Sequence, residues 1–511
     1  MTIKRFILSI LTIVAIAFIG FSLFSSVTQP QIQGRLELYQ TNLLLHSGEW
    51  QPEDLESNSF NRARKTLIGN DVYQAGLLQY QDARQSAENQ LEKQNQDLGN
   101  LPIKEGIEAE TKQLDLTVGQ LTSLINQLDI NIGILQAQKE KTDKAIQSWQ
   151  NVIQPKGEKK SLGETANILV GIWSEPAQIL PNSEALIQKN LDGWFRYRAL
   201  KQLYKLQERQ EALTQLKAEE QEIAEEAVLK LAIIAGVPGM GLLLGVGLLI
   251  FLGVQWLISG KESLLFKNSD LSWEVTWDGE TILQVFVVGF FLVGQIMIPL
   301  GLEIFKNFTN WQPTTMGVRV QAGYILGSYM LFASGGLLVL YFSLRSFFPL
   351  PEDWFKFDLR GGWILWGLGG YFVALPMVIL VSLINQQLWQ GQGGSNPILP
   401  IALKGQDGLA LALFYVTASI AAPVFEEIMF RGFLLPSLTK YMPIWGAILA
   451  SGFLFAAAHL NISEVLPLAV LGIILGVVYT RSRNLLSSML LHSLWNSGTL
   501  LSLYILGSGA S

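Results

Sequence analysis

The amino-acid sequence predicts an all-α protein, a polytopic bundle of about nine transmembrane helices with a helical extramembrane domain inserted after the first span. Three observations lead to this fold class. The 511-residue chain is 49% hydrophobic and only 15% charged, whereas soluble domains are usually about one quarter charged. Apolar runs long enough to cross a bilayer recur from residue 229 onward. Residues 29–228 are instead rich in Gln, Glu, Lys and Leu.

The first apolar run, residues 6–24, follows Lys4 and Arg5. About 20 residues, at 1.5 Å each, are enough to cross the hydrocarbon. A cleaved signal peptide usually has a shorter apolar core, of about 7–15 residues. We therefore expect residues 1–28 to form a retained membrane anchor. The alternative is a signal peptide that is cut near Ser25–Thr28.

Further spans are predicted after the extramembrane domain, because long apolar runs follow one another there. Residues 229–360 would hold accessory transmembrane helices, and residues 361–511 would hold the core that carries the candidate site. The expected spans lie at about 229–258, 281–303, 321–344, 361–384, 409–430, 443–460, 464–480 and 485–507.

The loop charges predict an orientation, because cytoplasmic loops carry an excess of Lys and Arg. With the N-terminus inside, the short outside loops hold only Lys306, Arg319 and Lys404. The inside loops then hold Lys4, Arg5, Lys261, Lys267, Arg345, Lys356, Arg360, Lys440, Arg481 and Arg483. The sequence therefore predicts a multi-pass membrane protein with a cytoplasmic N-terminus and a non-cytoplasmic 29–228 domain.

The 29–228 domain is expected to be helical and partly coiled-coil-like. Leucines recur every seven residues, at Leu114, Leu121, Leu128 and Leu135. Leu124 occupies a plausible second position of the same seam. Residues 191–228 form a long charged stretch, which predicts one helix that runs on into the second span. We expect this domain to bind a protein partner or to recruit a substrate.

Two local features of this domain have competing interpretations. Asp192–Arg198 is dense in aromatic residues and arginine. The core of a helical hairpin, anchored by the aromatic rings, is the favoured interpretation, and a partner contact is the alternative. His46 has no metal-ligand type of residue nearby, so we interpret it as a surface or helix histidine.

Composition excludes several classes of chemistry. The chain contains no cysteine, which excludes disulfides, thiolate zinc sites and cysteine nucleophiles. The formal net charge is −6 and no basic stripe is visible, so we expect no nucleic-acid partner. The lipid bilayer is the expected surrounding.

The strongest candidate for a functional site is a pair of adjacent glutamates, Glu426 and Glu427, inside a predicted span. A carboxylate in hydrocarbon is costly, so such groups are usually partnered and functional. Arg431 follows Glu427 by four residues, which places both on one helix face. We therefore expect Arg431 to neutralise Glu427 and Glu426 to be the free carboxylate, a candidate general base. In the alternative interpretation, the glutamates cap a helix end and Arg431 is a cytoplasmic anchor.

Two histidines follow in later apolar segments. His459 ends one segment, after three alanines that permit a close helix approach. His492 and Asn496 are four residues apart in the last span and share a face. Their N–H groups are suited to stabilising a developing oxyanion, although each residue taken alone could be a polar contact between helices.

These motifs, in this order on consecutive apolar segments, resemble those of the CPBP intramembrane proteases. That family includes the type II CAAX prenyl endopeptidases and the Abi-type immunity proteins. The resemblance covers roughly residues 360–507 and rests on Glu426-Glu427-x-x-x-Arg431, Phe455-x-x-x-His459 and His492-x-x-x-Asn496. It implies an intramembrane endopeptidase whose substrate is a membrane protein or peptide. Nothing in the sequence indicates prenylated substrates specifically.

The resemblance also implies roles for the motif residues. Glu426 with His459 would activate the attacking water, and the Glu427–Arg431 pair would orient Glu426. His492 and Asn496 would stabilise the oxyanion. A set of Glu426, His459 and His492 could instead bind Zn²⁺ with an open position for water. Both the metal-dependent and the metal-free mechanism stay open.

Other functions remain to be weighed against hydrolysis. The motif residues could hold together a non-catalytic scaffold or an immunity-type binding protein, or form a proton or cation relay in a transporter. A relay would spread ionisable groups along a path across the membrane. Here they cluster, with Tyr341, Tyr371 and Asn385 as the main polar residues elsewhere, which favours a localised site.

The depths of the two histidines constrain the helices. If the spans run straight, His459 lies near the outer face and His492 lies nearer the inner face. At least one helix must therefore be short, tilted or broken for them to meet. Pro423, Pro436 and Pro443 are the candidate break points.

Overall fold

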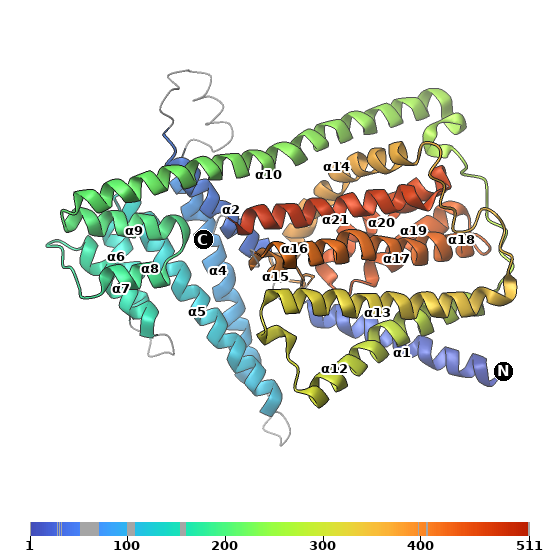
Figure 1. Ribbon diagram of the computed structural model, residues 1–511, viewed down its shortest axis with the longest axis horizontal. Coiled ribbons are helices and arrows are strands. Elements are labelled where there is room, and N and C mark those ends of the chain that lie inside the picture. The colour runs from blue at the N-terminus through green and yellow to red at the C-terminus, as the bar shows by residue number, and fades with distance from the viewer. Residues whose placement is uncertain are drawn as a thin grey trace. The chain divides into compact units, whose positions relative to one another are not determined.

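The computed structural model describes residues 2–27, 29, 31, 33–51, 71–99, 108–153, 160–396, 398–404 and 407–508. Helices make up 83% of these residues, and no strand occurs among them. The predicted all-α fold class is confirmed. The chain divides into two compact units (Figure 1). The membrane unit comprises Met1–Ile32 and Val237–Gly507, and the helical unit comprises Gln33–Gly236 with Ser508–Ser511.

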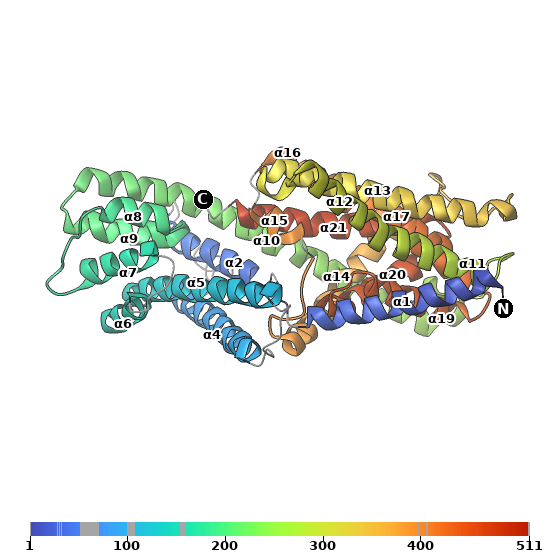
Figure 2. The same ribbon diagram turned by 90° about the horizontal axis from the view of Figure 1, so that it is seen from below.

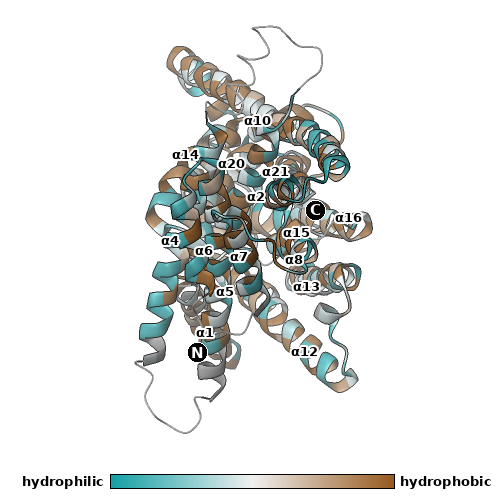
Figure 3. Ribbon diagram, turned by 90° about the vertical axis from the view of Figure 1, so that its left-hand side faces the viewer, coloured by the Kyte–Doolittle hydropathy of each residue, from teal (hydrophilic) through white to brown (hydrophobic). Residues whose placement is uncertain are grey.

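The helical unit is built from helices that pack against one another. Helix α5 packs against both α4 and α6, and α4 is largely hydrophilic in Figure 3. The helices are α2 (Gln33–Gly48), α4 (Val72–Gly99), α5 (Glu108–Gln138), α6 (Thr142–Ile153), α7 (Lys160–Trp173), α8 (Ser183–Asn190), α9 (Gly193–Leu206) and the first part of α10 (Gln210–Ser259).

Aromatic side chains form much of the core of the helical unit. Trp194 and Phe195 of α9 are buried, so the interpretation of this segment as hairpin core is confirmed. Trp149 of α6 is fully buried and donates its indole N–H to the Ile130 carbonyl at 3.0 Å. It packs on Gly133, where an added Cβ would lie 2.2 Å from the indole nitrogen. Only glycine permits this approach of α5 and α6.

The predicted leucine seam is only partly present. Leu128 and Leu135 are buried in the core, as the seven-residue spacing predicts. Leu124 is 36% exposed, so its assignment to a second seam position is wrong. In this part of α5, the leucines spaced seven residues apart pack in the core, whereas the residue at the second seam position does not. The coiled coil is not confirmed.

Two further details differ from the expectations. The single helix expected from residue 191 onward is interrupted, because Glu208 adopts a left-handed backbone (φ 57°) between the end of α9 and the start of α10. His46 lies on helix α2, which confirms the helix interpretation, and at 1% exposure it is not a surface residue. Burial lowers the pKa of His46 to about 4. The neutral imidazole packs edge-on against Tyr197, with ring centroids 5.8 Å apart.

The membrane unit is a bundle of apolar helices. In Figures 1 and 2, α13, α17 and α21 run alongside one another, whereas α12 leans away from them. Its main helices are α1 (Ile3–Ser26), the later part of α10, α11 (Gly279–Leu283), η3 (Gln284–Met297), α12 (Ile298–Thr309), α13 (Val318–Leu344), α14 (Trp363–Trp389), α15 (Ile398–Lys404), α16 (Gly408–Tyr415), η6 (Val416–Ala421), α17 (Ala422–Glu427), η7 (Ile428–Leu434), α18 (Leu435–Leu438), α19 (Ile444–Ala457), α20 (Ile462–Ser482) and α21 (Leu485–Gly507).

Seven helical stretches among the described residues are long and apolar enough to cross a membrane. They are Ile3–Ser26, Gln210–Glu262, Gly279–Thr309, Val318–Phe347, Trp363–Trp389, Gly408–Leu438 and Ile462–Ser482. The predicted nine spans are therefore not confirmed, because α19 has only 14 residues and α21 is not among the seven. At 1.5 Å per residue, α19 is about 21 Å long, which is shorter than the hydrocarbon thickness of about 30 Å.

Small residues bring α19 and α20 together. A Cβ added at Gly472 would lie 2.9 Å from both the Cα and the carbonyl oxygen of Gly452. The two helix backbones are therefore in direct contact, as small residues permit in membrane bundles. This contact places the backbone of α20 next to the candidate site.

Helix α1 is bonded to the rest of the membrane unit at both ends. Lys4 and Arg5 each lie 2.9 Å from Glu280. At the other end, the Ser26 hydroxyl accepts the N–H of Ile462 at 2.9 Å, at the start of α20. These contacts join α1 to α11 and to α20, and the retained anchor stays a prediction.

Candidate active site

Glu427 and Arg431 form a fully buried ion pair, as their spacing predicts. The Arg431 Nη1 donates to Glu427 Oε1 at 2.8 Å, and both side chains are 0% exposed. The Arg431 Nη2 donates to the carbonyl of Gly472 at 3.0 Å. The guanidinium also lies over the Phe455 ring, 4.5 Å from its centroid. The pair thus joins η7, α19 and α20 at one point.

His492 continues this network from α21. Its Nδ1 lies 3.0 Å from Glu427 Oε1. Because that carboxylate already accepts from Arg431, we assign the proton to Nδ1, which donates to Glu427. The opposite ring nitrogen, Nε2, lies 3.9 Å from Glu426 Oε2. This distance exceeds a direct hydrogen bond, so Nε2 faces Glu426 without binding it.

Glu426 points away from the buried pair, as its position one residue earlier predicts. Its Oε1 accepts a hydrogen bond from the Tyr329 hydroxyl at 3.2 Å. Its Oε2 is buried and has no hydrogen-bond partner within the described ranges. Glu427 Oε2 also has no hydrogen-bond partner within the described ranges. The two side chains differ in exposure, because Glu426 is 15% exposed and Glu427 is fully buried.

Tyr329 is the site residue that the sequence did not indicate. It lies on α13, roughly a hundred residues before the glutamates and outside the stretch that resembles the protease family. A tyrosine within an apolar span was a usable signal, yet the sequence drew attention to Tyr341 and Tyr371 instead. Tyr341, on the same helix, is 54% exposed and lies outside the site.

His459 follows the short helix α19. Its Nδ1 lies 2.9 Å from the Phe455 carbonyl, which can only accept, so Nδ1 donates and Nε2 is left free. The Phe455 ring contacts both histidines, with centroid distances of 4.9 Å to His459 and 5.6 Å to His492. Among the described residues, no hydrogen bond joins His459 to Glu426. The shortness of α19 brings His459 to the level of His492, which resolves the conflict of depths.

Asn496 stabilises an irregular turn of the helix before the glutamates. Pro423 has no N–H, so it cannot donate to the carbonyl four residues earlier, as in an α-helix, or to the one five residues earlier, as in a π-helix. The Asn496 Nδ2 donates to the Ala418 carbonyl at 2.7 Å, and the Ser493 hydroxyl donates to the Ser419 carbonyl at 2.5 Å. These carbonyls belong to η6, a π-helical turn of a kind that often occurs at functional sites.

The donor set does not fit a zinc site in this arrangement. No group of three His, Asp or Glu side chains among the described residues is placed to hold a metal ion. His492 Nδ1 is hydrogen-bonded to Glu427. Among the described residues, His459 is not bonded to either glutamate. The set of Glu426, His459 and His492 therefore stays a prediction, and no chemical step below passes through a metal.

The geometry as a whole offers one carboxylate for chemistry and one for support. The Glu427–Arg431–His492 network is buried, and each of its members is bonded to another member. Glu426 is held by one oxygen through Tyr329 and offers the other toward His492. A buried carboxylate oxygen without a protein partner is normally satisfied by water, so this arrangement is suited to holding and activating a water molecule.

Known proteins share this part of the chain. Residues 408–498 match the family described as Type II CAAX prenyl endopeptidase Rce1-like. A protein of Bacillus subtilis (strain 168), named "Putative membrane peptidase YdiL", is 26% identical over 209 residues, which cover 40% of this chain and 80% of that protein. No solved structure matches.

The matched region includes both glutamates, Arg431, both histidines and Asn496, whereas Tyr329 lies outside it. Together with the apolar helices, the match supports a multi-pass membrane protein with membrane protease activity in general terms. The Abi-type assignment finds no support. The predicted resemblance is confirmed for residues 408–498, which are similar to the Rce1-like family of type II CAAX prenyl endopeptidases.

Proposed function

We propose that this protein is an intramembrane endopeptidase in which Glu426 activates the water that attacks the peptide bond. The observation that carries the proposal is the position of Glu426. One carboxylate oxygen is fixed by Tyr329 at 3.2 Å, and the other, without a partner, faces His492 Nε2 at 3.9 Å. A scaffold would account for the buried Glu427–Arg431 pair, but it gives no role to Glu426, a second carboxylate in the apolar bundle that forms no ion pair with Lys or Arg among the described residues.

The two facing atoms suit a single water molecule. With the proton on Nδ1, His492 Nε2 is an acceptor, and Glu426 Oε2 is also an acceptor. A water about 2.8 Å from each would donate one hydrogen to Oε2 and the other to Nε2. Its lone pairs would then point away from both groups, toward a substrate carbonyl carbon.

Hydrolysis would follow from this arrangement. Glu426 takes a proton from the water as the water oxygen bonds to the carbonyl carbon, and the carbonyl oxygen becomes an oxyanion. The protonated Glu426 then gives the proton to the leaving nitrogen as the carbon–nitrogen bond breaks. His492 is fixed during these steps by Glu427, which is in turn fixed by Arg431. The substrate would be a protein or peptide at the membrane.

The roles of the remaining residues also follow from their contacts. Asn496 donates one amide hydrogen to the Ala418 carbonyl. We therefore propose that it acts mainly by stabilising the turn that precedes Glu426. His459 and His492 both contact the Phe455 ring, and the free Nε2 of His459 is suited to binding a proton or a substrate group.

We also propose that the N-terminus is cytoplasmic, as the loop charges predict. Labelling of single introduced cysteines from either side of the membrane would test this orientation.

Replacing Glu426 by Gln should abolish hydrolysis without unfolding the protein. Gln keeps the shape and the acceptor for Tyr329 but cannot take a proton, so turnover of a peptide should fall by about 10²–10⁴-fold. Purified protein in detergent is assayed against a peptide library, with Glu274→Gln as the control because Glu274 is exposed. Undiminished turnover of the Glu426 variant would refute the proposed base.

We expect the native protein to keep its activity in the presence of a metal chelator. Loss of activity on chelation would favour the zinc hypothesis.

Tyr329→Phe should impair turnover while leaving the fold intact. The change removes the hydrogen bond that orients Glu426, and such a bond to a charged group is worth about 1.5–3 kcal/mol, or roughly 10–100-fold in kcat. KM should change little. Tyr341→Phe, on the exposed face of the same helix, is the matched control. Equal kcat for the two variants would show that Tyr329 does not position the base.

Asn496→Ala should lower both stability and turnover. Loss of the bond to Ala418 leaves a carbonyl unpaired within the bundle, for which we expect about 0.6–2 kcal/mol in the free energy of unfolding. Turnover should fall with it, because the same turn carries Glu426. Tm and kcat are measured on one preparation. A fall of about 10²–10³-fold in kcat at unchanged Tm would instead assign Asn496 to the oxyanion.

A further inference from the structure

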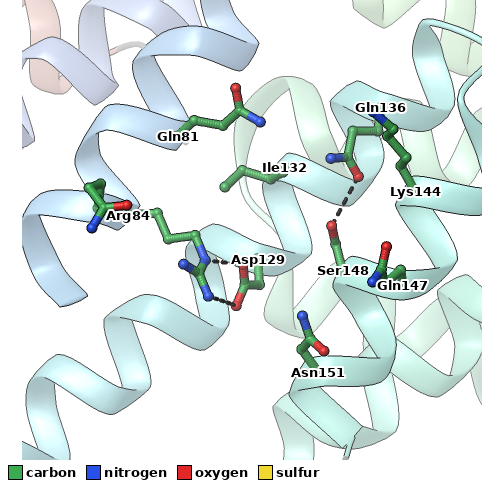
Figure 4. Close-up of a pocket in the computed structure, with 10 residues that line it drawn as sticks. Gln81, Arg84, Asp129, Ile132, Gln136, Lys144, Gln147, Ser148 and Asn151 are labelled. Atoms are coloured by element: carbon green, nitrogen blue, oxygen red, sulfur yellow. Dashed lines mark hydrogen bonds and ion pairs between the residues drawn. The ribbon is translucent and has the colours of Figure 1, made fainter.

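The helical unit carries a polar groove between α4 and α6, with α5 as its floor (Figure 4). Its volume of about 460 Å³ is within the range of ligand sites. The walls present carboxamides at helical spacing, with Gln81 and Gln85 on α4 and Gln147 and Asn151 on α6. Residues four apart lie one above the other on a helix. Two rows of amide side chains therefore line opposite sides of the groove.

The floor of the groove is polar but its charges are paired. Arg84 Nε lies 2.5 Å from Asp129 Oδ1, and Arg84 Nη1 lies 2.9 Å from Glu88. Asp129 is 5% exposed, and its burial raises the pKa of that carboxyl above the usual value. Gln136 is also buried and accepts a hydrogen bond from Ser148 at 3.0 Å. The floor thus offers hydrogen-bonding groups without a strong local charge.

This lining excludes several kinds of ligand. A phosphate or nucleic acid would be expected to meet several unpaired cations. Arg84 is neutralised by two carboxylates, which leaves Lys144 as a single unpaired cation among the described lining residues. An apolar ligand would meet only Ile132 among otherwise polar side chains. None of the described lining residues is aromatic, so no ring is present on which a sugar could stack.

A peptide backbone matches the lining more closely. Each carboxamide carries both donors and an acceptor, as each peptide unit carries an N–H and a C=O. An extended chain presents these groups alternately along its length. Main-chain hydrogen bonds of this kind supply affinity in known modes of peptide recognition. Gln85 gives one amide hydrogen to Asn89 at 3.0 Å, while Gln81, Gln147 and Asn151 have no side-chain hydrogen bond within the described ranges.

We propose that this groove binds an extended, polar segment of a polypeptide between the Gln81/Gln85 row and the Gln147/Asn151 row. Recognition rests on the backbone of the bound segment. The groove would therefore accept many sequences, provided that the segment is extended and polar. This function goes beyond peptide hydrolysis and does not depend on it, because none of the residues of the active site takes part.

The test measures binding in the full-length protein carrying Glu426→Gln, so that hydrolysis plays no part. The probe is an array of random ten-residue polar peptides without proline, and the best binder is then labelled for fluorescence anisotropy in detergent. Gln147→Ala removes one donor and one acceptor, so we expect Kd to rise roughly tenfold. Gln150→Ala is the matched control, because Gln150 is exposed on the same helix and lies outside the groove. Its Kd should be unchanged.

A copy of the binding peptide with methylated backbone nitrogens separates backbone recognition from side-chain recognition. We expect it to bind at least about tenfold more weakly, because it lacks the N–H donors. Absence of any peptide binding, equal Kd values for Gln147→Ala and Gln150→Ala, or unchanged binding of the methylated copy would each overturn the proposal. Because Glu426 is replaced in this test, a negative binding result does not bear on the proposed hydrolysis. Peptide binding by the native protein without hydrolysis would contradict only the proposed role of Glu426.

Discussion

The buried ion pair between Glu427 and Arg431 is the constraint on which the rest of the active site depends. Two charges taken out of water cost several kcal/mol each, and only close pairing offsets that cost. Here the pair is completed by the Gly472 carbonyl and by His492 Nδ1. Each of these partners comes from a different helix. Any shift of α20 or α21 would leave a charge unpaired, so the pair fixes the positions from which Glu426 and His492 face each other.

The irregular helices around the pair follow from a few residues. Pro423 removes one backbone donor from the turn before Glu426. Ser493 and Asn496 donate to two carbonyls of that turn. Gly452 and Gly472 let α19 and α20 touch, so a carbonyl of α20 reaches Arg431. The apolar bundle therefore uses backbone irregularity, covered by side-chain donors, to build a polar centre within a membrane domain.

Much of this could be predicted from the sequence, because it depends on local spacing. The four-residue interval of Glu427 and Arg431 predicted their pairing, and the apolar runs predicted an all-α membrane protein. Tyr329 could not be found in this way, since its contact with Glu426 spans about a hundred residues and no local pattern encodes it. The contact of His492 with Glu427, across 65 residues, is equally non-local. The exposure of Leu124 likewise depends on how α5 packs, not on its heptad spacing.

The most direct measurement of the central claim is a double-mutant cycle on the buried pair. The free energy of unfolding is compared for the native protein, Glu427→Gln, Arg431→Gln and the variant with both changes. If the pair holds the site together, each single change leaves a buried charge unpaired and should cost about 3–5 kcal/mol. The double change should then cost well below the sum of the two, with an interaction energy of about 2 kcal/mol or more. Additive costs would contradict the account.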